Sequence, residues 1–209
     1  MSRCVIISAG PFSDAAVLAG FLMPDDYIIA ADRGWRLAMD IGVLPSVLVA
    51  DFDSLELAEA PEGVKVVSLP EEKDETDTAY AMKIGYEAGY REFLLLGCTG
   101  GRLDHQQAAM IVAADYARRG CAVMLADEKN EVHFLVPGAY AFPVDKEESV
   151  SLFAFADTVQ GLFADGLYYD VNDITLTPFD PLCVSNRCLD NDFQIVFKSG
   201  LLLVYFSKD

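Results

Sequence analysis

The chain has 209 residues and a formal net charge of −18, because 33 acidic residues stand against 15 basic ones. So acidic a chain is a poor partner for nucleic acid, whose phosphates attract basic surfaces. Its hydrophobic content of 53% is ample for a buried core. No apolar run approaches the roughly 18 residues of a membrane-spanning helix, so we expect no membrane partner.

Cysteine usage indicates the compartment. The five cysteines are odd in number and form no Cys-x-x-Cys pair. The apolar run at Cys4–Ala9 has the length of a strand, not of the core of a signal peptide. We therefore expect reduced thiols and a cytoplasmic protein.

Up to about residue 127, short apolar runs alternate with helix-length segments. The expected strands are Cys4–Ala9, Tyr27–Ala31, Val47–Ala50, Lys65–Leu69, Phe93–Gly97 and Ala122–Ala126. The expected helices are Ala15–Phe21, Trp35–Ile41, Thr78–Ala88 and Gln106–Arg118. This alternation predicts a parallel sheet with helices on its faces.

Beyond residue 127 the pattern changes to short strands separated by Gly, Pro, Asn and Asp, which predicts an antiparallel β-sandwich or barrel. The expected strands are Val132–Val136, Val150–Phe155, Val159–Phe163, Leu167–Val171, Phe193–Phe197 and Leu201–Phe206. The predicted fold class is α/β + β, a Rossmann-like parallel α/β domain over residues 1–127 followed by a smaller antiparallel β-sandwich/barrel domain over residues 128–209.

The third expected strand runs directly into two acidic residues, Asp51 and Asp53. Open α/β sheets bind ligands just beyond the carboxyl ends of their strands. Mg²⁺ takes oxygen ligands, often one or two carboxylates together with substrate phosphates. The pair therefore predicts a site for Mg²⁺ and phosphate, and an acidic turn before a helix is the alternative.

Further acidic residues follow the other parallel strands: Asp32, Asp74, Asp77 and Asp104. Because parallel strands finish at one edge of a sheet, these carboxylates can converge, and a divalent cation is the simplest way to neutralise them. Each also has a local alternative. Asp74 and Asp77 have capping spacing, and Asp104 could be a helix N-cap.

A glycine-rich segment precedes the fourth expected helix. Gly97, Gly100 and Gly101 let backbone N–H groups approach an anion at a helix N-terminus. Arg102 adds a permanently charged phosphate donor. The spacing matches neither the Walker motif nor Gly-x-Gly-x-x-Gly, so the loop alone is weak support for a nucleotide site.

Taken in order, these segments resemble motifs of the thiamine pyrophosphokinase (thiamine diphosphokinase) family. The matching segments are Ala31–Gly34 to an Asp-Gly-Gly element, Pro45–Ser54 to Pro-x-x-x-x-Gly-Asp-Phe-Asp-Ser, Asp74–Thr78 to Asp-x-Thr-Asp, and Gly97–His105 to Gly-Gly-Arg-x-Asp-His. Near the C-terminus, Val184-Ser185-Asn186 resembles a shorter Ser-Asn element.

The resemblance implies an ATP domain joined to a thiamine-binding β-sandwich. It implies a homodimer with thiamine bound near the subunit interface. The implied reaction transfers diphosphate from ATP to the hydroxyl of thiamine, giving thiamine diphosphate and AMP. Mg²⁺ is the implied cofactor and ATP the co-substrate.

The resemblance also assigns roles to residues. Asp51, Asp53 and Asp77 would hold Mg²⁺, and Asp104 would orient or deprotonate the hydroxyl. The implied ATP-binding residues are Asp32, Gly34, Gly100, Gly101, Arg102 and His105. The implied thiamine-binding residues are Ser185 and Asn186. Trp35, Tyr168 and Tyr169 are candidate aromatic faces for the positive thiazolium ring, with a core position as the alternative.

The chain departs from the family pattern at Arg33, Ala50, Ala109 and Arg187. If Ala50 needs a positive φ, it carries strain that glycine avoids. None of the four is a proposed metal ligand.

Two other functions remain open. An apolar strand ending in Asp-x-Asp also resembles a haloacid-dehalogenase-type phosphatase, in which Asp51 is the covalent nucleophile. A non-catalytic thiamine- or nucleotide-binding protein would bind the same ligands without turnover.

Overall fold

The computed structural model describes residues 2–51, 62–69, 74–145 and 148–208, apart from the side chain of Asp51. The chain divides into two compact units, residues 1–113 with 123–128 and residues 114–122 with 129–209. Asp53 lies outside the described residues. The domain boundary expected after residue 127 stays a prediction.

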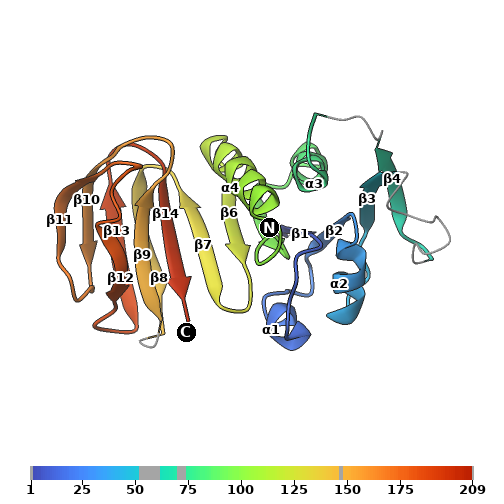
Figure 1. Ribbon diagram of the computed structural model, residues 1–209, viewed down its shortest axis with the longest axis horizontal. Helices are drawn as coiled ribbons and strands as arrows, with labels where there is room; N and C mark the ends of the chain where they lie inside the picture. Colours follow the sequence, from blue (N-terminus) through green and yellow to red (C-terminus); the bar gives the residue numbers. More distant parts are fainter. Residues whose placement is uncertain (1, 52–61, 70–73, 146–147, 209) are drawn as a thin grey trace. The chain divides into compact units, whose positions relative to one another are not determined.

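The first unit contains a sheet in the order β6-β5-β1-β2-β3-β4 (Figure 1). The strands are β1 Cys4–Ile7, β2 Tyr27–Ala31, β3 Val47–Asp51, β4 Lys65–Leu69, β5 Glu92–Leu96 and β6 Ala122–Ala126. The pairs β5–β1, β1–β2, β2–β3 and β3–β4 are all parallel. The predicted parallel sheet is confirmed, and its strands end together at one edge.

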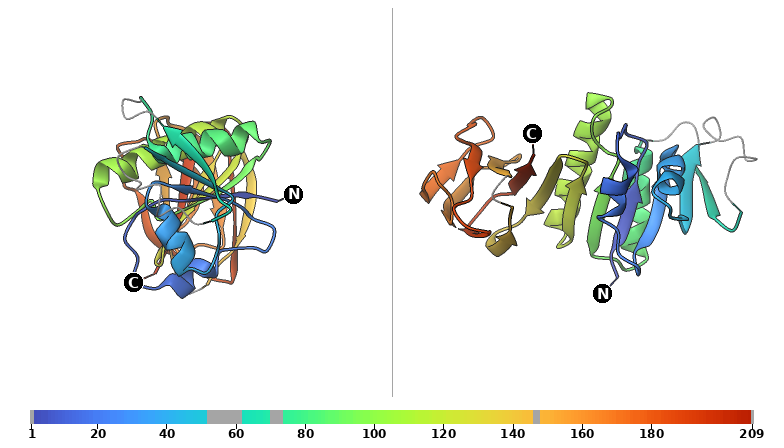
Figure 2. Two further views of the ribbon diagram at one scale, coloured as in Figure 1. Left: turned by 90° about the vertical axis from the view of Figure 1, so that its right-hand side faces the viewer. Right: turned by 90° about the horizontal axis from the view of Figure 1, so that it is seen from below.

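Helices cover both faces of this sheet. They are α1 Ala15–Ala19, α2 Gly34–Asp40, α3 Asp77–Glu87 and α4 Leu103–Arg118. The left view of Figure 2 shows the green helices on one side of the strands and the blue helices on the other. No helix of the described residues is long and apolar enough to cross a membrane.

Strand β1 shows why both faces need cover, because all four of its side chains are fully buried. Val5 and Ile7 pack with Leu18 of α1 and Leu37 of α2. On the opposite face, a Cβ at Gly85 of α3 would lie 2.7 Å from the Cys4 sulfur. Successive side chains of a strand point to opposite faces, so the continuous apolar run of β1 holds helices on both.

The helix starts differ from the expected caps. Thr76 is the N-cap of α3, since its hydroxyl accepts a hydrogen bond from the Ala79 N–H at 3.2 Å. Asp77 is therefore the first helical residue, where its charge favours the helix dipole. Asp104 lies inside the first turn of α4, which begins at Leu103. The alternative of Asp104 as N-cap is wrong, because the helix starts one residue earlier.

The second unit contains two antiparallel arrangements, β12-β9-β14-β7 and β11-β10-β13-β8. Its strands are β7 Asn130–Leu135, β8 Gly138–Pro143, β9 Ser149–Ala154, β10 Val159–Asp165, β11 Val171–Leu176, β12 Cys183–Arg187, β13 Asp192–Phe197 and β14 Leu202–Ser207. Alternate residues such as Val150 and Leu152 are buried in one shared core. The predicted antiparallel sandwich is confirmed.

One predicted strand of this unit is wrong. Residues 167–170 form a turn with only an isolated bridge, from Leu167 to Cys188, and β11 begins only at Val171. Gly166, with φ +90°, follows the end of β10. The Tyr168 N–H then donates to the Arg187 carbonyl at 2.8 Å, which holds the turn against β12. Strands β8 and β12 were missed, because Pro143 and the polar Ser-Asn-Arg segment weaken their apolar alternation.

Candidate active site

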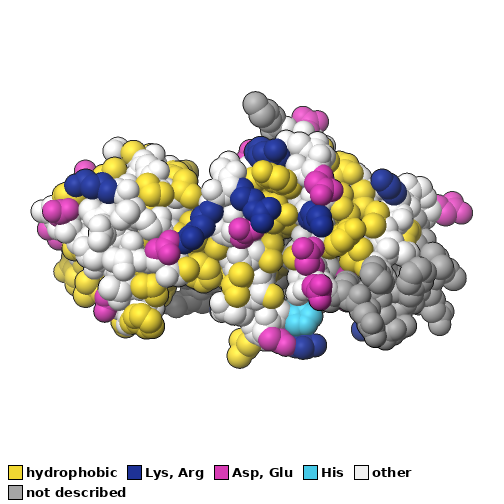
Figure 3. Space-filling view, turned by 90° about the horizontal axis from the view of Figure 1, so that it is seen from above, with side chains coloured by type: hydrophobic (Ala, Val, Ile, Leu, Met, Phe, Trp, Pro, Cys, Tyr) yellow, Lys and Arg dark blue, Asp and Glu magenta, His cyan; other side chains and the backbone are white. Residues whose placement is uncertain are grey.

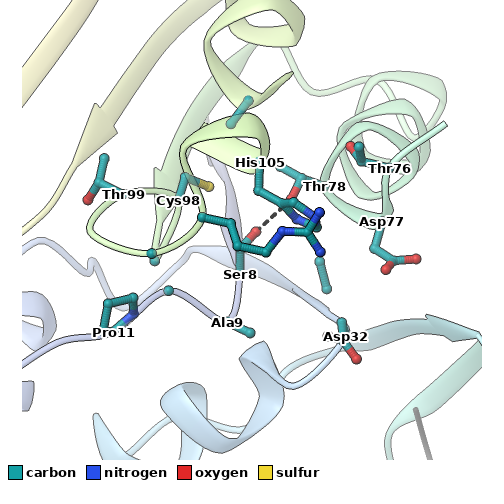
Figure 4. A pocket seen from close by; sticks show the side chains of 16 residues that line it. Ser8, Ala9, Pro11, Asp32, Thr76, Asp77, Thr78, Cys98, Thr99 and His105 are labelled. Carbon is teal, nitrogen blue, oxygen red and sulfur yellow. Dashed lines mark hydrogen bonds between the residues drawn. The ribbon is translucent and has the colours of Figure 1, made fainter. Parts of the chain in front are cut away.

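A cavity of about 340 Å³ opens at the carboxyl edge of the parallel sheet (Figure 4). Its walls come from the loops after β1, β2 and β5 and from the starts of α3 and α4. Five predicted site residues line it: Asp32, Asp77, Gly101, Arg102 and His105. In Figure 4, Asp32 and Asp77 lie on one side of the cavity, and Cys98 and Thr99 on the other.

Some predicted residues of this unit do not line the cavity. Gly34, Gly100 and Asp104 are not among the lining residues. The backbone of Asp51 closes β3, paired with Leu69 of β4. Among the described residues, no group of three His, Cys, Asp or Glu side chains is close enough to hold a metal ion. The predicted set of Asp51, Asp53 and Asp77 includes side chains outside the described residues and stays a prediction.

Asp32 has an unusual local state. Its φ is +50°, in the left-handed region that Asp adopts more readily than most residues. Its backbone N–H donates to the Val49 carbonyl at 2.7 Å, which fixes this conformation. The Oδ1 atom is buried and has no hydrogen-bond partner. Buried polar atoms almost always have partners, so the Asp32 carboxylate fits a ligand such as a hard cation.

Arg102 and Asp104 form a two-pronged ion pair. Arg102 Nε donates to Asp104 Oδ1 at 3.1 Å, and Nη2 donates to Oδ2 at 2.6 Å. Hydrogen bonding from Arg102 lowers the pKa of Asp104 to about 2. The Asp104 carboxylate is therefore charged at neutral pH and is a weak proton acceptor while this pair is intact. Both side chains are exposed, so a bound phosphate can compete for Arg102.

Glycines keep the backbone around the cavity tightly packed. A Cβ at Gly97, whose φ is +67°, would lie 2.3 Å from the Ser8 carbonyl oxygen. A Cβ at Gly34 would lie 2.0 Å from the carbonyl oxygen of Ile7. Gly34 is therefore needed for the close approach of α2 to β1. Ala50 lies inside β3 opposite Ser68 and has no positive φ, so the strain considered for it is not present.

Five polar residues of the cavity were not predicted as site residues: Ser8, Thr76, Thr78, Cys98 and Thr99. Ser8 directly follows β1, so the rule that pointed to Asp32 after β2 could have found it. Thr99 donates to the Asp127 carboxylate at 2.6 Å. Burial raises the pKa of the Cys98 thiol to about 11, so Cys98 is not a nucleophile at neutral pH.

The predicted thiamine-binding pair lies on β12 in the second unit. Asn186 is buried, and its Oδ1 accepts hydrogen bonds from the Tyr169 and Arg187 N–H groups, each at 2.9 Å. Its Nδ2 donates to the Tyr169 carbonyl at 2.8 Å. The Asn186 amide therefore holds the turn at residues 167–170. Ser185 is exposed, has φ +57° and donates its N–H to the Ser151 hydroxyl at 3.0 Å.

The three candidate aromatic residues differ in exposure. Trp35 packs against the buried cluster of Ala30, Leu48 and Ala50 in the first unit, which supports its core alternative. Tyr168 and Tyr169 are 57% and 60% exposed, and their rings meet edge to face with centroids 5.1 Å apart. Both tyrosines are therefore exposed enough for a cationic ring to contact them.

Replacing Asp32 separates folding from binding. We expect Asp32→Asn to leave the free energy of unfolding within about 0.5 kcal/mol of the parent, or to raise it, because the unpaired charge is removed. Nucleotide binding should weaken at least about ten-fold. Urea denaturation and calorimetry measure the two effects, with Asp40→Asn at the exposed end of α2 as control. A large loss of stability would show that this carboxylate has a structural role.

Comparison with known proteins identifies the family. Residues 19–125 match the family model "Thiamin pyrophosphokinase, catalytic domain", and residues 140–202 match "Thiamin pyrophosphokinase, vitamin B1 binding domain". Thiamine pyrophosphokinase of Bacillus subtilis (strain 168) is 26% identical over 216 residues, covering 100% of both chains.

Solved structures give the same result. The crystal structure of thiamine pyrophosphokinase from Bacillus subtilis has a TM-score of 0.89 at 25% identity, covering 100% of both chains. That of thiamin pyrophosphokinase from Geobacillus thermodenitrificans has a TM-score of 0.86 at 27% identity, covering 99% of this chain and 98% of the other. Because two successive family models match most of the sequence, the chain belongs to the thiamin pyrophosphokinase family.

Proposed function

We propose that this chain transfers diphosphate from ATP to the hydroxyl of thiamine, giving thiamine diphosphate and AMP. The observation that carries this conclusion is the match of both domains of the family, in order, on one chain. The sheet-edge cavity, with its acidic and basic lining, falls inside the first unit. The family match gives no support to the phosphatase alternative.

In this reaction the thiamine hydroxyl oxygen attacks the β-phosphorus of ATP. A bond forms between that oxygen and the β-phosphorus, and the bond from the β-phosphorus to the oxygen bridging to the α-phosphorus breaks. AMP leaves with the bridging oxygen. The hydroxyl proton passes to a carboxylate or to water. Little covalent work falls to the protein, so positioning and charge neutralisation dominate.

The residues present fit Mg²⁺ as the cofactor. The unpartnered Asp32 oxygen and the Asp77 carboxylate at the same cavity are hard oxygen donors of the kind that Mg²⁺ prefers. Asp51, Asp53 and Asp77 would hold the metal, as the family resemblance implies. When bound, the metal neutralises charge on the phosphates.

The basic side of the cavity would hold phosphate oxygens. Arg102 offers a planar fork, and the Gly100-Gly101 turn precedes the N-terminus of α4. His105 lines the same cavity within the first turn of that helix. Because Arg102 pairs with Asp104 in the free protein, phosphate binding would release the Asp104 carboxylate to accept the hydroxyl of thiamine.

Asp77 is the described metal candidate to test first. We expect Asp77→Asn to lower the rate of thiamine diphosphate formation at least about a hundred-fold, because a metal ligand is lost while the side-chain shape is kept. The rate is measured by incubating the protein with ATP, thiamine and Mg²⁺ and separating AMP, ADP and the thiamine phosphates by chromatography. Asp115→Asn, an exposed acid on α4 paired with Arg119, is the matched control.

The same assay separates the three functions. AMP and thiamine diphosphate formed in equal amounts support diphosphate transfer. Free phosphate with a trapped aspartyl-phosphate on Asp51 would support the phosphatase instead. Tight binding of ATP or thiamine with no product would support a binding protein.

The pairing of Arg102 with Asp104 makes a second prediction. We expect Asp104→Asn to tighten the binding of a non-hydrolysable ATP analogue by about two- to five-fold, since exposed ion pairs are weak and Arg102 is freed. Calorimetry measures the dissociation constant. In a protein that already carries Arg102→Gln, Asp104→Asn should tighten the binding of the analogue less, because no Arg102 guanidinium is freed. Weaker binding in Asp104→Asn alone would show that Asp104 itself contacts the nucleotide or its metal.

We propose that the second unit binds thiamine beside β12. The Asn186 amide would act by holding the Tyr168-Tyr169 turn, since its hydrogen bonds within the unit are already made. The exposed tyrosine faces and Ser185 would then meet the ligand. The guanidinium of Arg187 lies 4.8 Å from the centroid of the Tyr168 ring, so a cationic thiazolium would compete with it for that face.

We also propose a homodimer, supported by an apolar surface on two adjoining segments of the second unit. Its members are the exposed hydrophobic side chains of residues 168–169 and 182–189: Tyr168, Tyr169, Leu182, Val184 and Leu189. Such groups on a folded protein often mark an interaction site. We expect sedimentation velocity to give about twice the 22.8 kDa of one chain.

A charge on this surface should separate the subunits. Val184→Glu should shift the sedimenting species to the monomer, while Leu44→Glu, at a somewhat more exposed apolar position of the first unit, should not. A dimer that persists in Val184→Glu would place the contact elsewhere. A monomeric parent protein would overturn the dimer itself.

The net charge of the chain and the distribution of its basic side chains indicate which other classes of partner it can bind. Figure 3 shows Lys and Arg side chains scattered in small groups among acidic ones on the face drawn. With a net charge of −18, this favours small-molecule substrates over nucleic acid. We propose a cytoplasmic location, which the five buried cysteines support because none of them forms a disulfide.

A further inference from the structure

Two hydroxyl groups of residues that were not predicted as site residues, Ser8 and Thr78, meet in the cavity. Ser8 Oγ and Thr78 Oγ1 lie 2.8 Å apart, although they are 70 residues apart in the chain (Figure 4). Ser8 is 8% exposed, and its N–H donates to the Leu96 carbonyl of β5 at 2.8 Å. Its position is therefore fixed by the sheet.

Thr78 belongs to the first turn of α3, directly after Asp77. The two threonines that flank Asp77 form hydrogen bonds with different parts of the structure. Thr76 caps the helix through the Ala79 N–H, and Thr78 bonds to Ser8 at the sheet edge. The Asp77 carboxylate is thus carried by a turn that is tied both to its own helix and to the sheet.

The rest of α3 does not need this bond to stay in place. Ala81, Met82 and Gly85 are buried. Gly85 packs so closely that a Cβ there would lie 2.8 Å from the Phe93 ring. Loss of one hydroxyl would therefore leave the helix docked and loosen mainly its first turn.

We propose that the Ser8–Thr78 hydrogen bond positions the first turn of α3, and so holds Asp77 in the orientation in which it binds the metal–nucleotide. Ser8 and Thr78 are positioning residues here. The inference rests on the proposed function, in which Asp77 is a metal ligand. Small displacements of a positioned group cost large factors in rate.

Isosteric substitutions test this role. Thr78→Val keeps the branched shape and removes the hydroxyl, and Thr78→Ser keeps the hydroxyl. We expect Thr78→Val to lower kcat about ten-fold with little change in the melting temperature, and Thr78→Ser to restore most of the rate. Thr177→Val is the matched control, because it removes a threonine hydroxyl bonded to Asp180 in the second unit.

A binding measurement provides a readout independent of turnover. In calorimetry with a non-hydrolysable ATP analogue, Thr78→Val should weaken binding about ten-fold in the presence of Mg²⁺ and leave metal-free binding unchanged. Ser8→Ala should weaken binding in the presence of Mg²⁺ at least as much, because the Ser8 hydroxyl also contacts the Cys98 thiol. The double variant should bind no more weakly than Ser8→Ala, because that variant has already lost the bond to Thr78.

Two results would overturn the inference. In the first, Thr78→Val has the same kcat and the same Mg²⁺-dependent affinity as the parent protein. In the second, the losses of affinity in Ser8→Ala and Thr78→Val add up in the double variant. The proposed function fails differently. A parent protein that binds the magnesium nucleotide but forms no thiamine diphosphate would overturn the reaction, and the calorimetry would still decide the positioning role.

Discussion

Parallel pairing of the strands is the constraint on which the first unit depends. Strands β5, β1, β2 and β3 run in one direction, so the residues that follow them gather at one edge. This is why Ser8, Asp32 and Arg102 line one cavity although about a hundred residues of sequence separate the first from the last. The buried strands provide a rigid base, and their loops provide the chemistry.

Such convergence has an electrostatic cost, and the structure deals with it in two ways. The exposed Asp104 is neutralised by Arg102 within the protein. The Asp32 carboxylate instead keeps a buried oxygen without a partner. Under the proposed function, Arg102 would exchange Asp104 for a phosphate when substrate binds, whereas the Asp32 oxygen would gain a partner. Substrate binding would therefore change Arg102 and Asp32 differently.

The sequence predicted the elements whose signals are local and strong. The exact bounds of β2, β4 and β6 were predicted, and β2 shows why, because its apolar run lies between Asp26 and Asp32. The turn at residues 167–170 was mistaken for a strand, because its conformation depends on the Asn186 amide, 17 residues further along the chain. For the same reason the sequence could not show the contact between Ser8 and Thr78. Motif spacing identifies acidic residues, but it does not report which hydroxyls meet in space.

Gly34 and Asp32 are two residues apart in one motif, yet different physical constraints determine their residue types. Asp32 has an oxygen that lacks a partner, while Gly34 lacks a side chain because the Ile7 carbonyl occupies that space. Loss of activity in a variant of either residue would look the same in a screen of living cells. The amount of folded protein recovered would differ between the two variants, since a side chain at Gly34 obstructs the packing of α2 against the sheet. A motif therefore shows which positions of a chain tolerate no substitution. Whether a position is intolerant for a chemical or a steric reason is learned only when the yield of folded protein is measured together with activity.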